Sequence, residues 1–150
     1  MIGLALTPLQ FKTLLRMVYM ANTVVNGHRD EDYAKEYDDL EQYVFSRAKD
    51  AGFPAATAHH KMAGEEHHHP SLIFENDPEV NALLDEYDVH IMIELLSEKL
   101  AERDIELAHG QSAKEKMPER DYLKLLEFTA DNYDKEFLAN GLKNLIIKSE

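Results

Sequence analysis

The longest stretch of the chain without a helix-breaking residue lies between Pro78 and Gly110. Asp77 can cap this stretch, Pro78 suits a first helical position, and Glu79 places an acid near the positive end of the helix dipole. Apolar residues recur along it every three or four positions, as one stripe and then another. The first stripe comprises Val80, Leu84, Tyr87, Ile91 and Leu95, and the second comprises Ile93, Leu96, Leu100 and Leu107. We predict one helix ending at about His109 that packs on two sides or bends.

Three further helices are bounded by similar signals. Thr7-Pro8-Leu9-Gln10 combines a cap, a first-turn proline and a capping box, and Asn26-Gly27 can end that helix in the left-handed conformation. The second is predicted from Asp30 to Gly52. Its apolar stripe comprises Tyr33, Tyr37, Leu40, Val44 and Ala48, and its acidic side, expected to face solvent, comprises Glu36, Asp38, Asp39 and Glu41. Another is predicted from Pro118 to Asn140, followed by a short helix that contains Leu142, Leu145, Ile146 and Ile147.

These elements predict the fold class. No useful run of strand-type alternation is found, although Pro54 to Met62 could form a short helix and residues 71–74 a short apolar run. We therefore expect an all-α, up-and-down bundle of four long helices plus a short C-terminal helix, with residues 53–77 as one long irregular crossing. A chain of 150 residues favours a single domain over residues 1–150.

The first helix is the most apolar segment of the chain. Its only charged residues are Lys12 and Arg16, and apolar side chains cover more than half of its circumference. Such a helix lies in the centre of a core or is half-covered by a second subunit. We expect Lys12 and Arg16 to pair with carboxylates of the second or third helix, and the chain to form a homo-oligomer, with a dimer as the first expectation.

Composition excludes several classes of function. The formal net charge of −13 argues against nucleic acid and anionic membranes as partners, because phosphate surfaces need a basic footprint. The absence of cysteine excludes thiol nucleophiles, disulfides and cysteine-based metal sites. With no legible export signal and no apolar run long enough to span a membrane, we expect a cytoplasmic protein.

The most unusual local feature is a histidine cluster, because five of the eight histidines lie within eleven positions. Imidazole and carboxylate groups bind divalent transition metals such as zinc, nickel or iron. The candidate ligands are His59, His60, His67, His68, His69, Glu65 and Glu66. Their spacing matches no closed structural site, so a polar surface loop without a specific role and a pH-responsive loop remain alternatives.

A second candidate site lies on the long third helix. Glu86, His90, Glu94 and Glu98 are four residues apart and share one ridge, so His90 and Glu94 are further possible metal ligands. Glu106 and His109 have the spacing of di-iron ligands, but no second helix carries the matching pair, which favours salt bridges and helix-end chemistry. The polar residues of the turn around His28 and Asp32 are explained by helix capping. No recognised catalytic motif is present in the sequence.

Three functions are consistent with these sequence features. The first is a non-catalytic protein that acts through protein contacts as a homo-oligomer. The second is a metal-binding helical protein that uses the histidine-rich segment. The third is an acidic mimic of nucleic acid, which rests only on the net charge. We expect the first, with metal binding as the alternative, and the sequence shows no legible catalytic chemistry.

Overall fold

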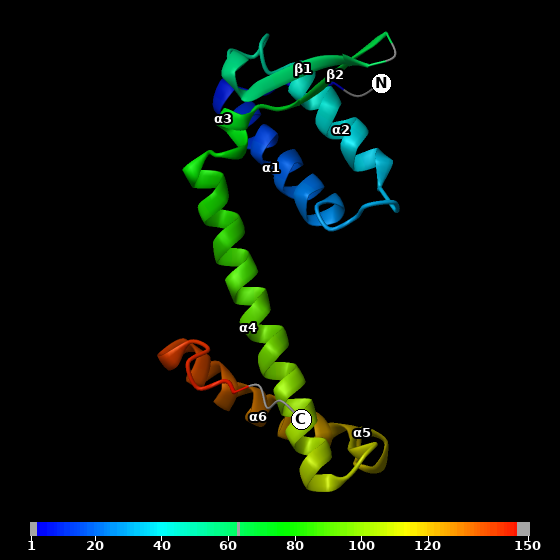
Figure 1. Ribbon diagram of the computed structural model, residues 1–150, viewed down its shortest axis with the longest axis vertical. Helices are drawn as coiled ribbons and strands as arrows, with labels where there is room; N and C mark the ends of the chain where they lie inside the picture. Colours follow the sequence, from blue (N-terminus) through cyan, green and yellow to red (C-terminus); the bar gives the residue numbers. More distant parts are fainter. Residues whose placement is uncertain (1–2, 63, 147–150) are drawn as a thin grey trace. The chain divides into compact units, whose positions relative to one another are not determined.

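The computed structural model describes residues 3–62 and 64–146 and divides the chain into two compact units, Met1–Leu84 and Asp85–Glu150. The first unit contains α1 (Pro8–Asn26), α2 (Lys35–Ser46), a 3₁₀ turn η1 (Pro54–Ala56), the strands β1 (Thr57–Met62) and β2 (Glu65–Pro70), and α3 (Leu72–Glu75) (Figure 1). The boundary falls within α4 (Pro78–His109), and α5 (Ala113–Lys116) and α6 (Glu119–Asn140) complete the second unit. The expectation of a single domain stays a prediction.

The predicted start of α1 is confirmed. The Thr7 hydroxyl accepts from the Gln10 backbone amide at 3.3 Å, while the Gln10 side chain accepts from the Thr7 amide at 2.9 Å. This capping box satisfies amides that have no partner within the helix. At the other end Gly27 has φ −63°, so the predicted left-handed termination is wrong.

The second helix begins later than the sequence indicates. Residues around Asp30 form a bend, and α2 begins at Lys35. The reason is a contact from α1: the Asn26 side chain accepts from the Ala34 amide at 2.8 Å and donates to the Ala34 carbonyl at 3.1 Å. A buried asparagine on one helix thus fixes the beginning of the next.

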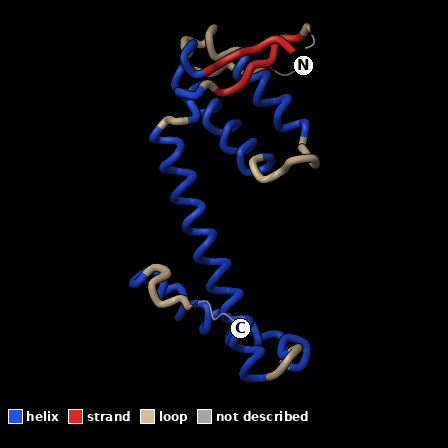
Figure 2. The backbone as a smooth tube through the Cα atoms, viewed as in Figure 1, coloured by secondary structure: helices blue, strands red, loops and turns tan. Residues whose placement is uncertain are grey.

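Residues 53–77 are not an irregular crossing, and the all-α up-and-down bundle is wrong. β1 and β2 form an antiparallel two-stranded sheet (Figure 2). In its register His59 pairs with His68 and His60 with His67. The predicted short helix from Pro54 ends after one 3₁₀ turn, because Thr57 already has extended backbone angles. Gly64, directly before β2, has φ +90°, a conformation that favours glycine. The fold is mostly helical with one β-hairpin.

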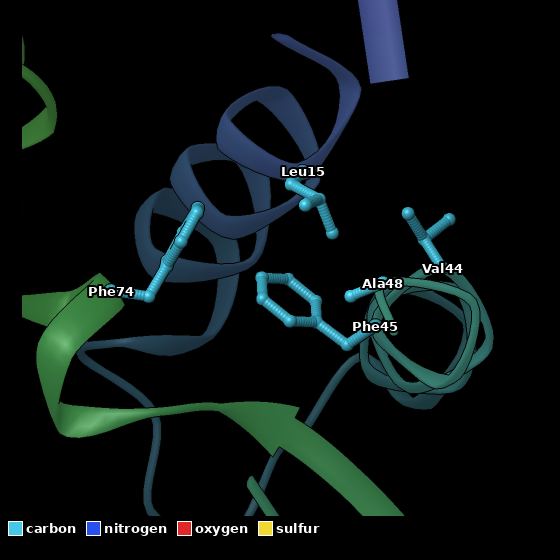
Figure 3. Packing of buried hydrophobic residues seen from close by; sticks show 5 residues of the cluster. All are labelled: Leu15, Val44, Phe45, Ala48 and Phe74. Atoms are coloured by element: carbon cyan, nitrogen blue, oxygen red, sulfur yellow. The ribbon is translucent and has the colours of Figure 1, made fainter. Parts of the chain in front are cut away.

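A small aromatic core holds the first unit together. Leu15 from α1, three residues of α2 and the segment that follows it, and Phe74 from α3 are buried in one cluster (Figure 3). The Phe45 and Phe74 rings meet edge to face with centroids 5.1 Å apart, a favourable aromatic geometry. Phe74 therefore fixes the chain that leaves the hairpin to the helix pair.

The sequence predicts the two long helices of the second unit, but it does not predict α5, and its prediction for the C-terminal end is wrong. α4 ends at His109 and α6 at Asn140, next to glycines with positive φ. Ile105, Ala113 and Tyr122 form a small core. In place of the predicted C-terminal helix, residues 141–144 form turns and residues 145–146 have no regular structure, while Ile147 lies outside the described residues.

The predicted pairing of Arg16 is also confirmed. Its guanidinium donates to Asp77, which precedes α4, at 3.1 Å, and to Glu79 in the first turn of α4. Asp77 also accepts from the Glu79 amide at 2.9 Å, so it caps α4 as expected. The backbone amide of Glu79 and the Arg16 guanidinium together hold the pKa of the Asp77 carboxyl below its ordinary value.

Candidate functional site

The hairpin distributes the five clustered histidines over its two faces. Because side chains alternate along a strand, His60, His67 and His69 share one face, while His59 and His68 share the other. The His60 ring lies 5.5 Å from the His67 ring and 5.3 Å from the His69 ring, measured between centroids. Glu65 belongs to the first face and Glu66 to the second, where its carboxylate lies 4.0 Å from His68 Nε2.

The structure does not arrange these side chains as a metal site. The His60 and His67 rings are stacked at 16°, so their in-plane lone pairs do not converge on one point. His67 Nδ1 contacts Gln42 Oε1 at 3.1 Å, and His69 Nδ1 lies 2.9 Å from the Pro70 carbonyl oxygen. Within residues 3–62 and 64–146, no three His, Asp or Glu side chains are placed to hold a metal ion. Metal binding by this segment stays a prediction.

The second predicted ligand pair is exposed. His90 and Glu94 lie one turn apart on α4, with 4.0 Å between His90 Nε2 and a Glu94 oxygen. Glu94 also lines a hollow of about 480 Å³ between α4 and α6, together with Glu98, Glu127, Asp131 and Asp134. Five carboxylates therefore line one hollow, and Asp131 among them pairs with Lys135.

A polar pocket that the sequence does not reveal lies in the first unit. It has a volume of about 330 Å³ and is bounded by α1, the loop before α2, α2 itself, the end of β2, and α3. Its polar lining comprises Tyr19, Asn22, Thr23, Asn26, Tyr33, Asp38, Glu41, His69 and Glu75. His69 is thus the one residue of the histidine cluster that also belongs to this pocket.

Glu41 is the most unusual residue of the pocket. The sequence places it on the solvated side of α2, yet it is only 6% exposed, whereas the neighbouring Leu40 is exposed. Asn22 explains this, because its side-chain amide donates to Glu41 Oε2 at 2.9 Å from the facing helix. The expectation that Glu41 faces solvent is therefore wrong.

A chain of hydrogen bonds holds this carboxylate in place. Asn26 donates to Asn22 Oδ1 at 2.7 Å, which turns the Asn22 amide nitrogen toward Glu41. Asn26 is itself fixed by both backbone groups of Ala34. Among the described residues, none donates a hydrogen bond to the second oxygen of Glu41, Oε1. The pocket thus presents a positioned acceptor with free capacity.

The surroundings of Glu41 favour its protonated form. Burial raises the pKa of its carboxyl to about 7, the hydrogen bond from Asn22 opposes this, and the charges of Asp38 and Glu75 add to it. Burial also raises the pKa of Tyr19 and Tyr33, so both phenols stay neutral at physiological pH. Groups with perturbed pKa values in a cleft are candidates for function.

Comparisons with known proteins identify no relative of this chain: no family model, no curated protein and no solved structure matches it. In the part of the chain that the structure describes, no helix has the length and apolar character needed to cross a membrane.

Proposed function

We propose that this protein acts in the cytoplasm through protein contacts, and that it pairs with a second copy of itself along the outer face of α1. One observation carries the proposal: α1 has an apolar face on the side away from its core. We call this face the α1 stripe. It comprises Leu9, Thr13, Met17, Met20 and Val24, which recur every three or four residues.

The α1 stripe contains large apolar side chains that are mostly exposed. Leu9 is 74% exposed, Met17 58% and Val24 51%, whereas Leu15 is the one large apolar residue of α1 that is fully buried. Thr13 adds no free polar group, because its hydroxyl donates to the Leu9 carbonyl at 3.1 Å. A continuous apolar face on a helix is typical of protein interaction sites.

Electrostatics favour a second copy of the chain as the partner that covers the α1 stripe. Residues 1–27 contain no acidic residue, whereas the chain as a whole carries a net charge of −13. Two copies that meet along α1 therefore bring no carboxylates of this segment together. Arg16, beside the stripe, is already paired with Asp77 and Glu79. Contact through the acidic hollow between α4 and α6 would incur like-charge repulsion instead.

Two matched substitutions test this assignment. Val24→Glu places a charge in the α1 stripe, and Val89→Glu makes the same change at a valine of α4 that is 54% exposed. Sedimentation velocity should show that Val24→Glu shifts the chain to monomer, because an unpaired charge would be buried in the interface. Val89→Glu should leave the oligomer intact. Dissociation by Val89→Glu alone, or by both variants equally, would overturn the assignment to α1.

Transition-metal binding by the hairpin is a second candidate function. It is favoured by one observation, the three imidazoles of His60, His67 and His69 on one face. Rotation of the rings out of the stacked arrangement would let their nitrogens converge. Elemental analysis of untagged protein should then find zinc, nickel or iron near one per chain, and His60→Ala should remove it while His109→Ala retains it. Protein that is free of metal and whose melting temperature is unchanged by added zinc contradicts this candidate.

A further inference from the structure

The pocket around Glu41 indicates a further property of the protein, which does not depend on self-association. A buried carboxylate costs free energy unless it is paired, and well-packed apolar residues of similar volume are often at least as stable. Glu41 makes no salt bridge to any described residue. Its single hydrogen bond, from a neutral amide, leaves Oε1 free. Core stability alone therefore gives no reason for a glutamate at this position.

Charged side chains from several elements face the pocket, and most of them are negative. α2 contributes Asp38 and Glu41, and α3 contributes Glu75. The other titratable groups are Tyr19 of α1, Tyr33 of the loop before α2, and His69 of β2. Of the residues that the structure describes, no lysine or arginine lines the pocket. The cavity therefore attracts a positively charged ligand.

We propose that this pocket binds a small organic cation with an ammonium group, and that the carboxylate of Glu41 is its principal counter-ion. An ammonium group has three donors and no acceptor, which matches a lining of carboxylate, phenol and amide oxygens. The volume of about 330 Å³ is near the lower end for ligand pockets and suits a molecule of a few heavy atoms. Asp38 and Glu75, which also line the pocket, add negative charge that favours a ligand with a second ammonium group, such as a diamine.

An organic cation fits better than a metal ion. No three carboxylate or imidazole groups of the described residues are placed to coordinate a metal, in this pocket or elsewhere. Asn22 and Asn26 use their side chains on each other, on Glu41 and on Ala34, which fixes the walls before a ligand enters. A preorganised polar pocket reduces the entropy that a ligand loses on binding.

Calorimetric titration of the full chain with 1,4-diaminobutane tests the proposal, with uncharged 1,4-butanediol as the control ligand. At pH 8 the diamine should bind and the diol should not. Glu41→Gln keeps the shape of the side chain and removes its charge, so the affinity for the diamine should fall about tenfold or more. Glu36→Gln removes the same charge from an exposed position of α2 and should change the affinity less than about twofold.

Proton release on ligand binding is a second measurement, and it would not be observed if Glu41 had only a structural role. Because burial raises the pKa of Glu41 to about 7, part of its population is protonated at pH 7 and must ionise to pair with the ligand. Titrations in buffers of different ionisation enthalpy should therefore show net proton release at pH 7, and release should vanish in Glu41→Gln. Equal weakening by Glu36→Gln and Glu41→Gln, binding of the diol, or no binding of the diamine would each overturn the proposal.

Discussion

Single side chains decide the chemistry of the first unit. Asn22 and Asn26 lie one turn apart on the apolar α1, and this pair is the signal in the sequence that could have indicated a buried polar network. The pair becomes part of a network with Glu41, which lies nineteen residues after Asn22 in the sequence. Only the tertiary fold brings Glu41 within hydrogen-bond distance of Asn22. The spacing on α2 alone indicates Leu40 as the buried residue, and packing against α1 buries Glu41 in its place.

The raised pKa of Glu41 predicts how its replacement changes stability with pH. Its folded pKa of about 7 lies above the ordinary value of 4.5, so ionisation destabilises the folded state as pH rises from 4.5 to 7. Glu41→Gln, which does not titrate, should raise the free energy of unfolding by about 1–3 kcal/mol at pH 8 relative to the unmodified chain. At pH 4 this advantage should be absent.

Urea unfolding at pH 4, 6 and 8 measures this effect, with Glu36→Gln as the control. The control carboxylate is exposed, so its replacement should change the free energy of unfolding by less than about 0.5 kcal/mol at each pH. An equal difference between Glu41→Gln and the unmodified chain at all three pH values would contradict a raised pKa at Glu41.

At the scale of elements, the sequence predicts correctly the features that depend on neighbouring residues, and it misses those that depend on contacts between distant residues. The caps at Thr7 and Asp77 and the end at Asn140 are local signals, and the helices that they bound are found as expected. The hairpin lacks the usual alternation of apolar and polar residues, because most of its positions from His59 to His69 are histidine, lysine or glutamate. Its strands are defined by their pairing and by packing of β2 on α2, as in the contact of His67 with Gln42.

The junction after the hairpin depends on one aromatic ring. Phe74 lies in a four-residue helix too short to be stable alone, and it packs edge to face against Phe45 and Tyr19. Phe74→Ala should reduce the free energy of unfolding by about 3–5 kcal/mol, because it leaves a cavity in the small core. Phe128→Ala removes an exposed ring from α6 and should cost less than about 1 kcal/mol in chemical unfolding. Similar losses in the two variants would contradict this role of Phe74.

At the scale of the whole molecule, the distribution of charge matters more than its sum. The whole chain carries a net charge of −13, but residues 1–27 contain no acidic residue, and their two charged residues are basic. Acidic side chains gather in the hollow between α4 and α6 and around Glu41. The sequence thus indicates which segment has no acidic residue, while the positions of the two acidic hollows follow only from the fold.

Sedimentation equilibrium of the unmodified chain at tens of micromolar tests the central claim, self-association along α1, most directly. The chain has a mass of 17.2 kDa, and pairing along the α1 stripe predicts a particle of about twice that mass, which Val24→Glu returns to 17.2 kDa. A mass of 17.2 kDa for the unmodified chain over the whole concentration range would contradict the claim.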